Sequence, residues 1–185
     1  MERKYPRARW HDYNCGIYFV TVCTHGRSMS LGTISNHAIE LTPIGHFLHT
    51  CIEEIPRHDP DVQIDTFVVM PNHFHAIIVV GSRHAAASQA QPDIGCLKPP
   101  RHPDKSDNFN RRTHHNARLS KVIGGVKSAT TRFAKNYNAA FSWQPNFHDH
   151  IIRTHEAYVM ICDYIANNVK RWDKDCFNPN SGQPI

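Results

Sequence analysis

Two histidines separated by a single residue, His73 and His75, lie near the start of an apolar run. If that run is a β-strand, alternate side chains share a face, so both imidazoles point to one side and Phe74 points to the other. Neutral imidazole is a common ligand of divalent transition metals, so the spacing predicts a site for one ion. Two histidines that face water at a sheet edge would give the same spacing. His148 and His150 repeat it and are direct competitors for such a site.

A phenol and an amide form a second candidate pair, because Tyr164 and Asn168 are one helical turn apart. A free tyrosine has a pKa of ~10 and is a poor nucleophile at neutral pH, so a nearby cation that favours the phenolate would be needed. The alternative is a structural tyrosine, which buries its ring beside an apolar stripe and leaves its hydroxyl in water.

Positive charge is concentrated in one part of the chain. The formal net charge is +5, and residues 101–135 alone hold nine basic residues against two aspartates. Apolar residues between 119 and 133 recur at helical spacing, which predicts an amphipathic helix with a basic face. We expect this face to contact nucleic-acid phosphates, although a solvated charged face would give the same pattern. The four candidate cations are Lys121, Lys127, Arg132 and Lys135.

The elements that must position these groups can be read from residue patterns. β-branched and aromatic runs predict strands, and threonines before apolar stripes predict helix starts. The run after residue 73 is apolar on both faces, so its strand should be central and covered on both sides. We expect strands at 17–23, weakly within 31–41, at 62–70 and 73–81, an extended segment at 143–153, and helices from Thr42 to Pro56, over 119–133 and after Thr154. This order favours an antiparallel α+β sandwich.

A chain of 185 residues fits one domain, and we expect a long insertion or mobile loop at about 82–118. No apolar run reaches the ~18 residues of a membrane span, and no signal peptide is evident, so we expect a soluble cytoplasmic protein without a membrane partner. The six cysteines form no Cys-x-x-Cys pair and should be reduced thiols.

Three motifs together carry a resemblance to a known family. They are Met-Pro-Asn-His-Phe-His at 70–75, Trp-Gln at 143–144 with Phe-His-Asp-His-Ile-Ile-Arg at 147–153, and Tyr-Ile-x-x-Asn at 164–168. In this order and spacing the chain resembles the REP-associated tyrosine transposases, which are relatives of the single-tyrosine HUH transposases of the insertion sequence 200 type. The resemblance covers roughly residues 13–178, and the segment 82–118 matches poorly. The family often has Asn-Pro where this chain has Asn168-Val169.

The resemblance implies a ferredoxin-like or RRM-like HUH fold that acts on single-stranded or hairpin DNA. His73 and His75 match the ligands of a divalent metal, and Asn168 matches the residue that can complete the site. Tyr164 matches the nucleophile, which attacks a DNA phosphate to give a 5′-phosphotyrosine and a free 3′-hydroxyl. Imidazole is softer than Mg²⁺ prefers, so Mn²⁺ is at least as good a candidate for the ion. His148 and His150 match a family segment outside the metal site.

We therefore expect a metal-dependent single-strand DNA endonuclease and strand-transferase. The main alternative is a non-catalytic hairpin-binding protein derived from such a transposase, in which Tyr164 only packs. A replication-initiator nuclease with the same metal pair is a second alternative, disfavoured because nothing in the sequence suggests an attached helicase. The sequence leaves open the hairpin recognised, the cleavage dinucleotide, and whether the chain works as a monomer or as a homodimer.

Overall fold

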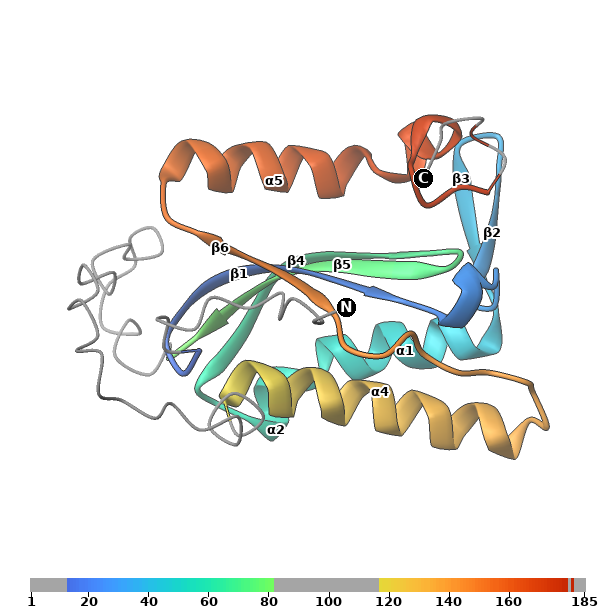
Figure 1. The fold of residues 1–185 in the computed structure, drawn as a ribbon, viewed down its shortest axis with the longest axis horizontal. Helices are drawn as coiled ribbons and strands as arrows, with labels where there is room; N and C mark the ends of the chain where they lie inside the picture. Colours follow the sequence, from blue (N-terminus) through green and yellow to red (C-terminus); the bar gives the residue numbers. More distant parts are fainter. Residues whose placement is uncertain (1–12, 82–116, 180, 182–185) are drawn as a thin grey trace, which may run out of the picture.

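The computed structural model describes residues 13–81, 117–179 and 181. Its centre is a four-stranded antiparallel sheet in the order β4-β5-β1-β6, with helices on both faces (Figure 1). The strands are β1 (Gly16–Cys23), β4 (Val62–Met70), β5 (His73–Val80) and β6 (His148–Ile152). The expected antiparallel α+β class is therefore confirmed.

One face of the sheet is covered by α1 (Pro43–Glu53) and α4 (Arg118–Asn136), with the short helix α2 (Ile55–His58) beside them. Thr42 caps α1 by accepting a hydrogen bond from the Gly45 backbone N–H at 3.1 Å. The single helix predicted from Thr42 to Pro56 is two helices in the structure, because α1 ends at Glu53 and α2 starts at Ile55. Pro56 lies in the first turn of α2, where proline is tolerated. The main hydrophobic core lies between these helices and the sheet, and includes Tyr18, Val20, Val22, Leu48, Phe74 and Ile123.

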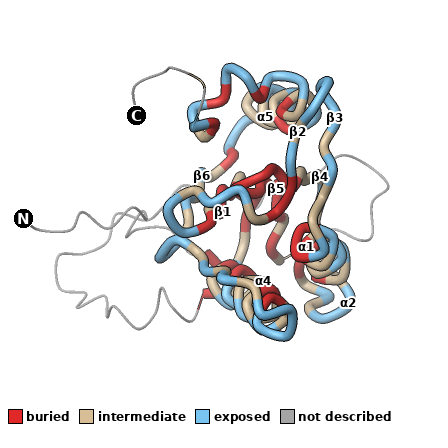
Figure 2. The backbone as a smooth tube through the Cα atoms, turned by 90° about the vertical axis from the view of Figure 1, so that its right-hand side faces the viewer, coloured by how far each residue is buried: buried red, intermediate tan, exposed pale blue. Residues whose placement is uncertain are grey.

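The other face carries α5 (His155–Asn167), which Thr154 caps by accepting a hydrogen bond from the Ala157 backbone N–H. Ile165 of α5 belongs to a second apolar cluster with one buried isoleucine from each of three strands: Ile17, Ile77 and Ile152. Figure 2 shows the buried strand β5 between the two helix layers. The prediction of a central strand covered on both sides is therefore confirmed.

Two sequence expectations differ from the structure in detail. The single weak strand expected within 31–41 is a hairpin of β2 (Gly32–Ser35) and β3 (Ala38–Leu41), which forms a separate two-stranded sheet. Its turn residues Asn36 and His37 both have positive φ, as tight hairpin turns require. The expected extended segment at 143–153 contains a strand only in its last part, preceded by an isolated bridge from Trp143 to Thr24.

The remaining elements are short 3-10 helices. They are η1 (His25–Arg27), after β1, and η4 (Val169–Lys174), which follows α5 directly. Most of the expected loop at about 82–118 lies outside the described residues, and α4 begins at its last residue, Arg118. Among the described residues, the structure contains no helix with the length and apolar character needed to cross a membrane.

Candidate active site

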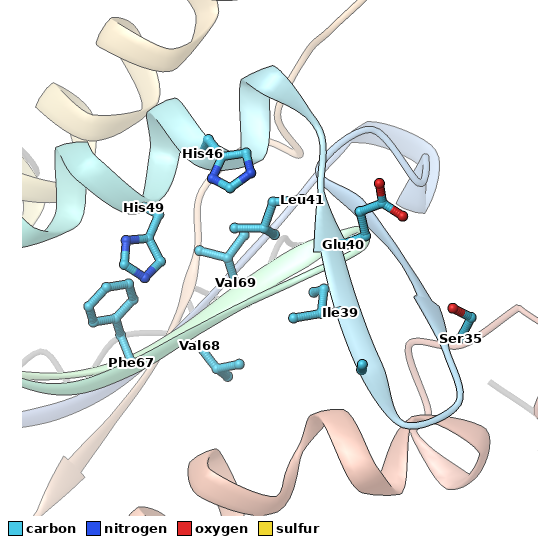
Figure 3. Close-up of a pocket in the computed structure, with 10 residues that line it drawn as sticks. Ser35, Ile39, Glu40, Leu41, His46, His49, Phe67, Val68 and Val69 are labelled. Atoms are coloured by element: carbon cyan, nitrogen blue, oxygen red, sulfur yellow. The ribbon is translucent and has the colours of Figure 1, made fainter.

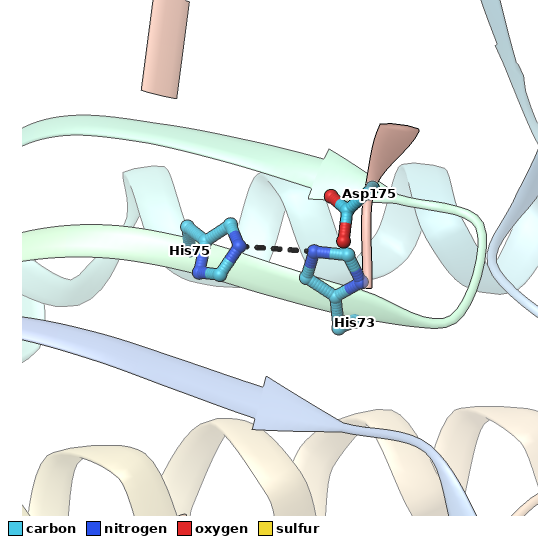
Figure 4. A group of neighbouring side chains, drawn as sticks. All are labelled: His73, His75 and Asp175. Atoms are coloured by element: carbon cyan, nitrogen blue, oxygen red, sulfur yellow. Dashed lines mark hydrogen bonds between the residues drawn. The ribbon is translucent and has the colours of Figure 1, made fainter. Parts of the chain in front are cut away.

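His73 and His75 lie side by side at the start of β5, on the sheet face that α5 covers. Both side chains are buried, and their Nε2 atoms are 3.0 Å apart (Figure 4). The turn at Pro71 and Asn72 places His73 as the first residue of the strand, and the two-residue strand period then brings His75 onto the same face. The two ring nitrogens therefore converge on one point inside the protein.

Asn72 fixes the orientation and the proton position of the first imidazole. The Asn72 amide Nδ2 donates to the Phe177 carbonyl oxygen at 2.8 Å, so its Oδ1 faces Nδ1 of His73, also at 2.8 Å. Because an amide oxygen only accepts, Nδ1 of His73 must carry the proton. The lone pair of Nε2 is then left facing His75, as is usual for a histidine whose second nitrogen is held for metal binding.

The second imidazole is held by β1. Nδ1 of His75 lies 2.9 Å from Thr21 Oγ1, and the Thr21 hydroxyl can serve either tautomer of the ring. Burial lowers the pKa of His73 well below its usual range, with the charges of His75 and Arg27 acting in the same direction. Burial also lowers the pKa of His75 to about 4, against a hydrogen bond to the Val20 backbone that acts to raise it. Both rings are therefore neutral at pH 7 and able to bind a cation.

A carboxylate that the sequence patterns did not single out joins the pair. Ligand atoms of His73, His75 and Asp175 all lie within 4.8 Å of one another (Figure 4). Asp175 follows η4 and is buried, and burial raises the pKa of its carboxyl group. Nothing in the local pattern distinguishes Asp175 from the exposed Asp173, because only the path of η4 brings it to the histidines.

Asn168 contributes an amide to the same cluster. Its side chain is buried and interacts with both the Tyr164 hydroxyl and the Asp175 carboxylate. Yet Asn168 Oδ1 and Asp175 Oδ2 have no hydrogen-bond partner among the described residues. Buried oxygens without partners cost free energy unless a ligand satisfies them. Two such oxygens next to two neutral imidazoles are a donor set that fits a divalent cation.

Tyr164 brings a hydroxyl group to this cluster from α5. Its Oη is 3.3 Å from Nε2 of His75, and its ring packs edge-on against Phe19 with centroids 6.1 Å apart. Burial raises the pKa of this phenol, the Asp175 charge raises it further, and the Asn168 interaction lowers it. The phenol is therefore protonated at pH 7, and a cation at the cluster would oppose the two effects that keep it so.

Tyr158 and Tyr137, the tyrosines nearest to Tyr164 in the sequence, lie away from the histidine cluster. Tyr158, on the same helix, donates a 2.6 Å hydrogen bond to Asp65 Oδ2, and burial together with Asp65 raises its pKa. Tyr137 is 60% exposed and follows α4 on the opposite face of the sheet. Of the three tyrosines, Tyr164 is the one beside the histidine pair.

The basic helix lies on the face opposite the histidine cluster, and its four candidate cations divide into two groups. Lys121, Arg132 and Lys135 are exposed, as a phosphate-binding face requires. Lys127 differs from the expectation, because its Nζ donates to the carbonyl oxygens of Gln144 and Asn146 at 2.8 and 2.9 Å. Burial lowers the pKa of this amine. Lys127 therefore fastens the segment before β6 and is a poor candidate for a phosphate contact.

A separate groove of about 560 Å³ lies at the outer edge of β4, lined by β3, α1 and β4 (Figure 3). Two of its lining side chains, His46 and His49, come from α1. His49 pairs with Glu53 at 3.2 Å and packs against the Phe67 ring. None of the clustered groups around His73 and His75 lines this groove, so the convergent chemistry lies elsewhere.

Comparisons with known proteins support the fold described above. A scan of protein-family profiles finds no match. An uncharacterised protein of Haemophilus influenzae is 30% identical over 175 residues, covering 94% of this chain and 91% of that protein. The solved structure of a REP-associated tyrosine transposase bound to a REP hairpin superposes with a TM-score of 0.54 at 22% identity, covering 92% of this chain and 74% of that one. The chain therefore belongs to the same family as the Haemophilus influenzae protein, and its fold is that of the REP-associated tyrosine transposases.

Proposed function

We propose that this protein is a metal-dependent single-strand DNA endonuclease and strand-transferase that acts through Tyr164. The observation that carries the proposal is the position of the Tyr164 hydroxyl, 3.3 Å from a buried pair of neutral imidazoles. Packing alone would not require a phenol, two histidines, a carboxylate and an amide to converge with two buried oxygens left without partners.

Four side chains would hold the ion: His73, His75, Asp175 and Asn168. Two nitrogen and two oxygen donors suit Mn²⁺ at least as well as Mg²⁺, which prefers oxygen ligands and retained water. When bound, such an ion supplies an electrophilic contact for a nonbridging phosphate oxygen and a positive charge beside the phenol.

The reaction balances with the groups present. Tyr164 Oη gives up its proton and attacks the phosphorus, and the bond from phosphorus to the 3′ oxygen breaks. The 3′ oxygen takes up a proton and leaves as a hydroxyl, while the 5′ phosphate stays on the tyrosine. Asn168 orients the Tyr164 hydroxyl, and packing against Phe19 holds the Tyr164 ring in place. Because the new bond is itself a phosphodiester, the 3′-hydroxyl can reverse the step and rejoin strands.

Hairpin DNA is the substrate that we propose. The solved neighbour is bound to a REP hairpin, and the exposed cations of α4 can contact the phosphates of a duplex stem. The helix α4, which carries these cations, and the helix α5, which carries Tyr164, lie on opposite faces of the sheet (Figure 1). A hairpin that uses both must therefore pass around the sheet, with its stem on one side and a single-stranded segment on the other.

A covalent-adduct assay tests the proposal. Wild type, incubated with Mn²⁺ and labelled hairpins drawn from the DNA that flanks the gene, should give a protein-linked band on a denaturing gel. Tyr164→Phe removes one hydroxyl and should abolish the band, whereas Tyr158→Phe should keep it. Excess chelator added to wild type should suppress the band, and so should the substitution His73→Ala.

The outcomes separate the alternatives. A Tyr164→Phe protein that still becomes linked to DNA would show that another residue is the nucleophile. Wild type that binds these hairpins tightly and never becomes linked would support the non-catalytic hairpin-binding alternative. Unchanged activity in chelator would remove the metal from the proposal.

A further inference from the structure

The sheet face beside Tyr164 continues along β1 and β6 beyond the part that α5 covers. In the strand register, Thr21 of β1 stands opposite His75 of β5 on one side and His148 of β6 on the other. Phe19 of β1 likewise stands opposite His150. Directly opposite residues of antiparallel strands share a face. Phe19, His148 and His150 therefore lie on the same face as the histidine cluster, and we call these three residues the β6 strip.

The β6 strip is open because α5 diverges from β6 along its length. Ile152, at the end of β6 from which α5 starts, is buried in the apolar cluster under the helix. His150 and His148 are successively farther from that end, and both are exposed. Figure 2 shows α5 above β5, with β6 to one side of it. Phe19, the member of the strip whose ring contacts Tyr164 of α5, is only half-buried.

The strip begins at the proposed nucleophile. The Phe19 ring stacks on His75 with centroids 5.1 Å apart and meets the edge of the Tyr164 ring. From β5 to β6 the distance is two strand spacings, or about 10 Å. A stacked DNA strand rises about 3.4 Å per nucleotide, so this distance corresponds to about three nucleotides. A strand with its phosphate at Tyr164 would reach both histidines without bending away from the sheet.

We propose that the β6 strip binds the bases of the single-stranded DNA that adjoins the phosphate attacked by Tyr164. The inference rests on the proposed function, and it adds the path of the substrate strand. Flat rings on an open sheet face are a common platform for unpaired bases, and histidine is among the side chains on which bases stack. The strip offers rings and no ammonium or guanidinium group, so it suits exposed bases better than the phosphates of a duplex.

Binding measurements with two probes test the strip. Tyr164→Phe protein, which should bind without reacting, is titrated with a labelled blunt hairpin and with the same hairpin carrying a single-stranded extension. Adding His148→Ala and His150→Ala should weaken binding of the extended hairpin tenfold or more, because two rings that stack on bases are removed. Binding of the blunt hairpin should not change. His58→Ala, which alters an exposed histidine on α2, is the matched control.

A stacking role also predicts the effect of a different aromatic ring. Replacing His150→Ala by His150→Phe should restore most of the affinity for the extended hairpin. An equal loss of affinity for both hairpins, or no loss of affinity for the extended hairpin, would contradict the proposed role of the strip. Wild-type adduct formation separates this failure from that of the proposed function. If wild type forms the adduct and the double variant binds normally, the strip is wrong. If wild type forms no adduct but the double variant binds only the extended hairpin more weakly, the proposed role of the strip holds and the catalytic role of Tyr164 fails.

Discussion

Lowering the pH from 6.5 to 4 in the presence of a chelator should destabilise the fold through His75. An unfolded chain takes up a proton on histidine near pH 6.5, whereas burial keeps His75 neutral until about pH 4. Between these values the unfolded state binds one more proton, so the free energy of unfolding falls as the pH falls. At about 1.4 kcal/mol per pH unit, the loss reaches about 3 kcal/mol. His73, whose pKa is also lowered by burial, acts in the same direction.

Urea unfolding at several pH values between 7 and 4 measures this effect. The quantity of interest is the pH slope of the unfolding free energy, compared between wild type and His75→Gln. Between pH 6.5 and 4, removing His75 should reduce this slope by nearly the amount that corresponds to one bound proton, about 1.4 kcal/mol per pH unit. His58→Gln, at an exposed position, should leave the slope unchanged. A His75→Gln protein with the wild-type slope would show that burial does not hold this histidine neutral in the native state.

Four further predictions concern the metal cluster, two helical glycines and the basic face. Asp175→Asn should weaken Mn²⁺ binding tenfold or more by calorimetry, while Asp173→Asn, at an exposed position in η4, should not. Gly45→Ala should destabilise the fold in thermal unfolding by several kcal/mol, because a Cβ there would overlap the Leu31 carbonyl oxygen. Gly124→Ala, in open space on α4, should stabilise it by about 0.5–1 kcal/mol. The exposed cations of α4 are Lys121, Arg132 and Lys135. Neutralising them should reduce the slope of the logarithm of the hairpin binding constant against the logarithm of salt concentration by about 0.9 for each lost phosphate contact.

Local patterns were enough to predict the elements that bury residues with a regular period. The strand with two apolar faces is β5, and the threonine caps of α1 and α5 stand where the sequence placed them. The hairpin at 32–41 was harder, because its strands are four residues long and its faces alternate only weakly. Strands this short carry too few residues for a period to stand out.

The features that the sequence patterns did not reveal depend on contacts between distant segments. Asp175 reaches the histidines through a 3-10 helix and a turn, which no helical spacing rule describes. Lys127 looked like its exposed neighbours because the carbonyl oxygens that it contacts belong to residues 144 and 146. His73, His75 and Tyr164 could be singled out because their motifs are local, but the distance between the phenol and the imidazole came only from the packing of α5.

The bond between Asn72 and Phe177 has a consequence for synthesis of the chain, because its partners are 105 residues apart. At about 5–20 residues per second, a ribosome needs roughly 5 to 20 s to pass from one to the other. During that interval the histidines emerge with neither the carboxylate nor the phenol that share their cluster. The nascent chain therefore cannot carry the proposed nuclease until residues 164–177 have been made, and the proposed centre assembles only as α5 and η4 dock.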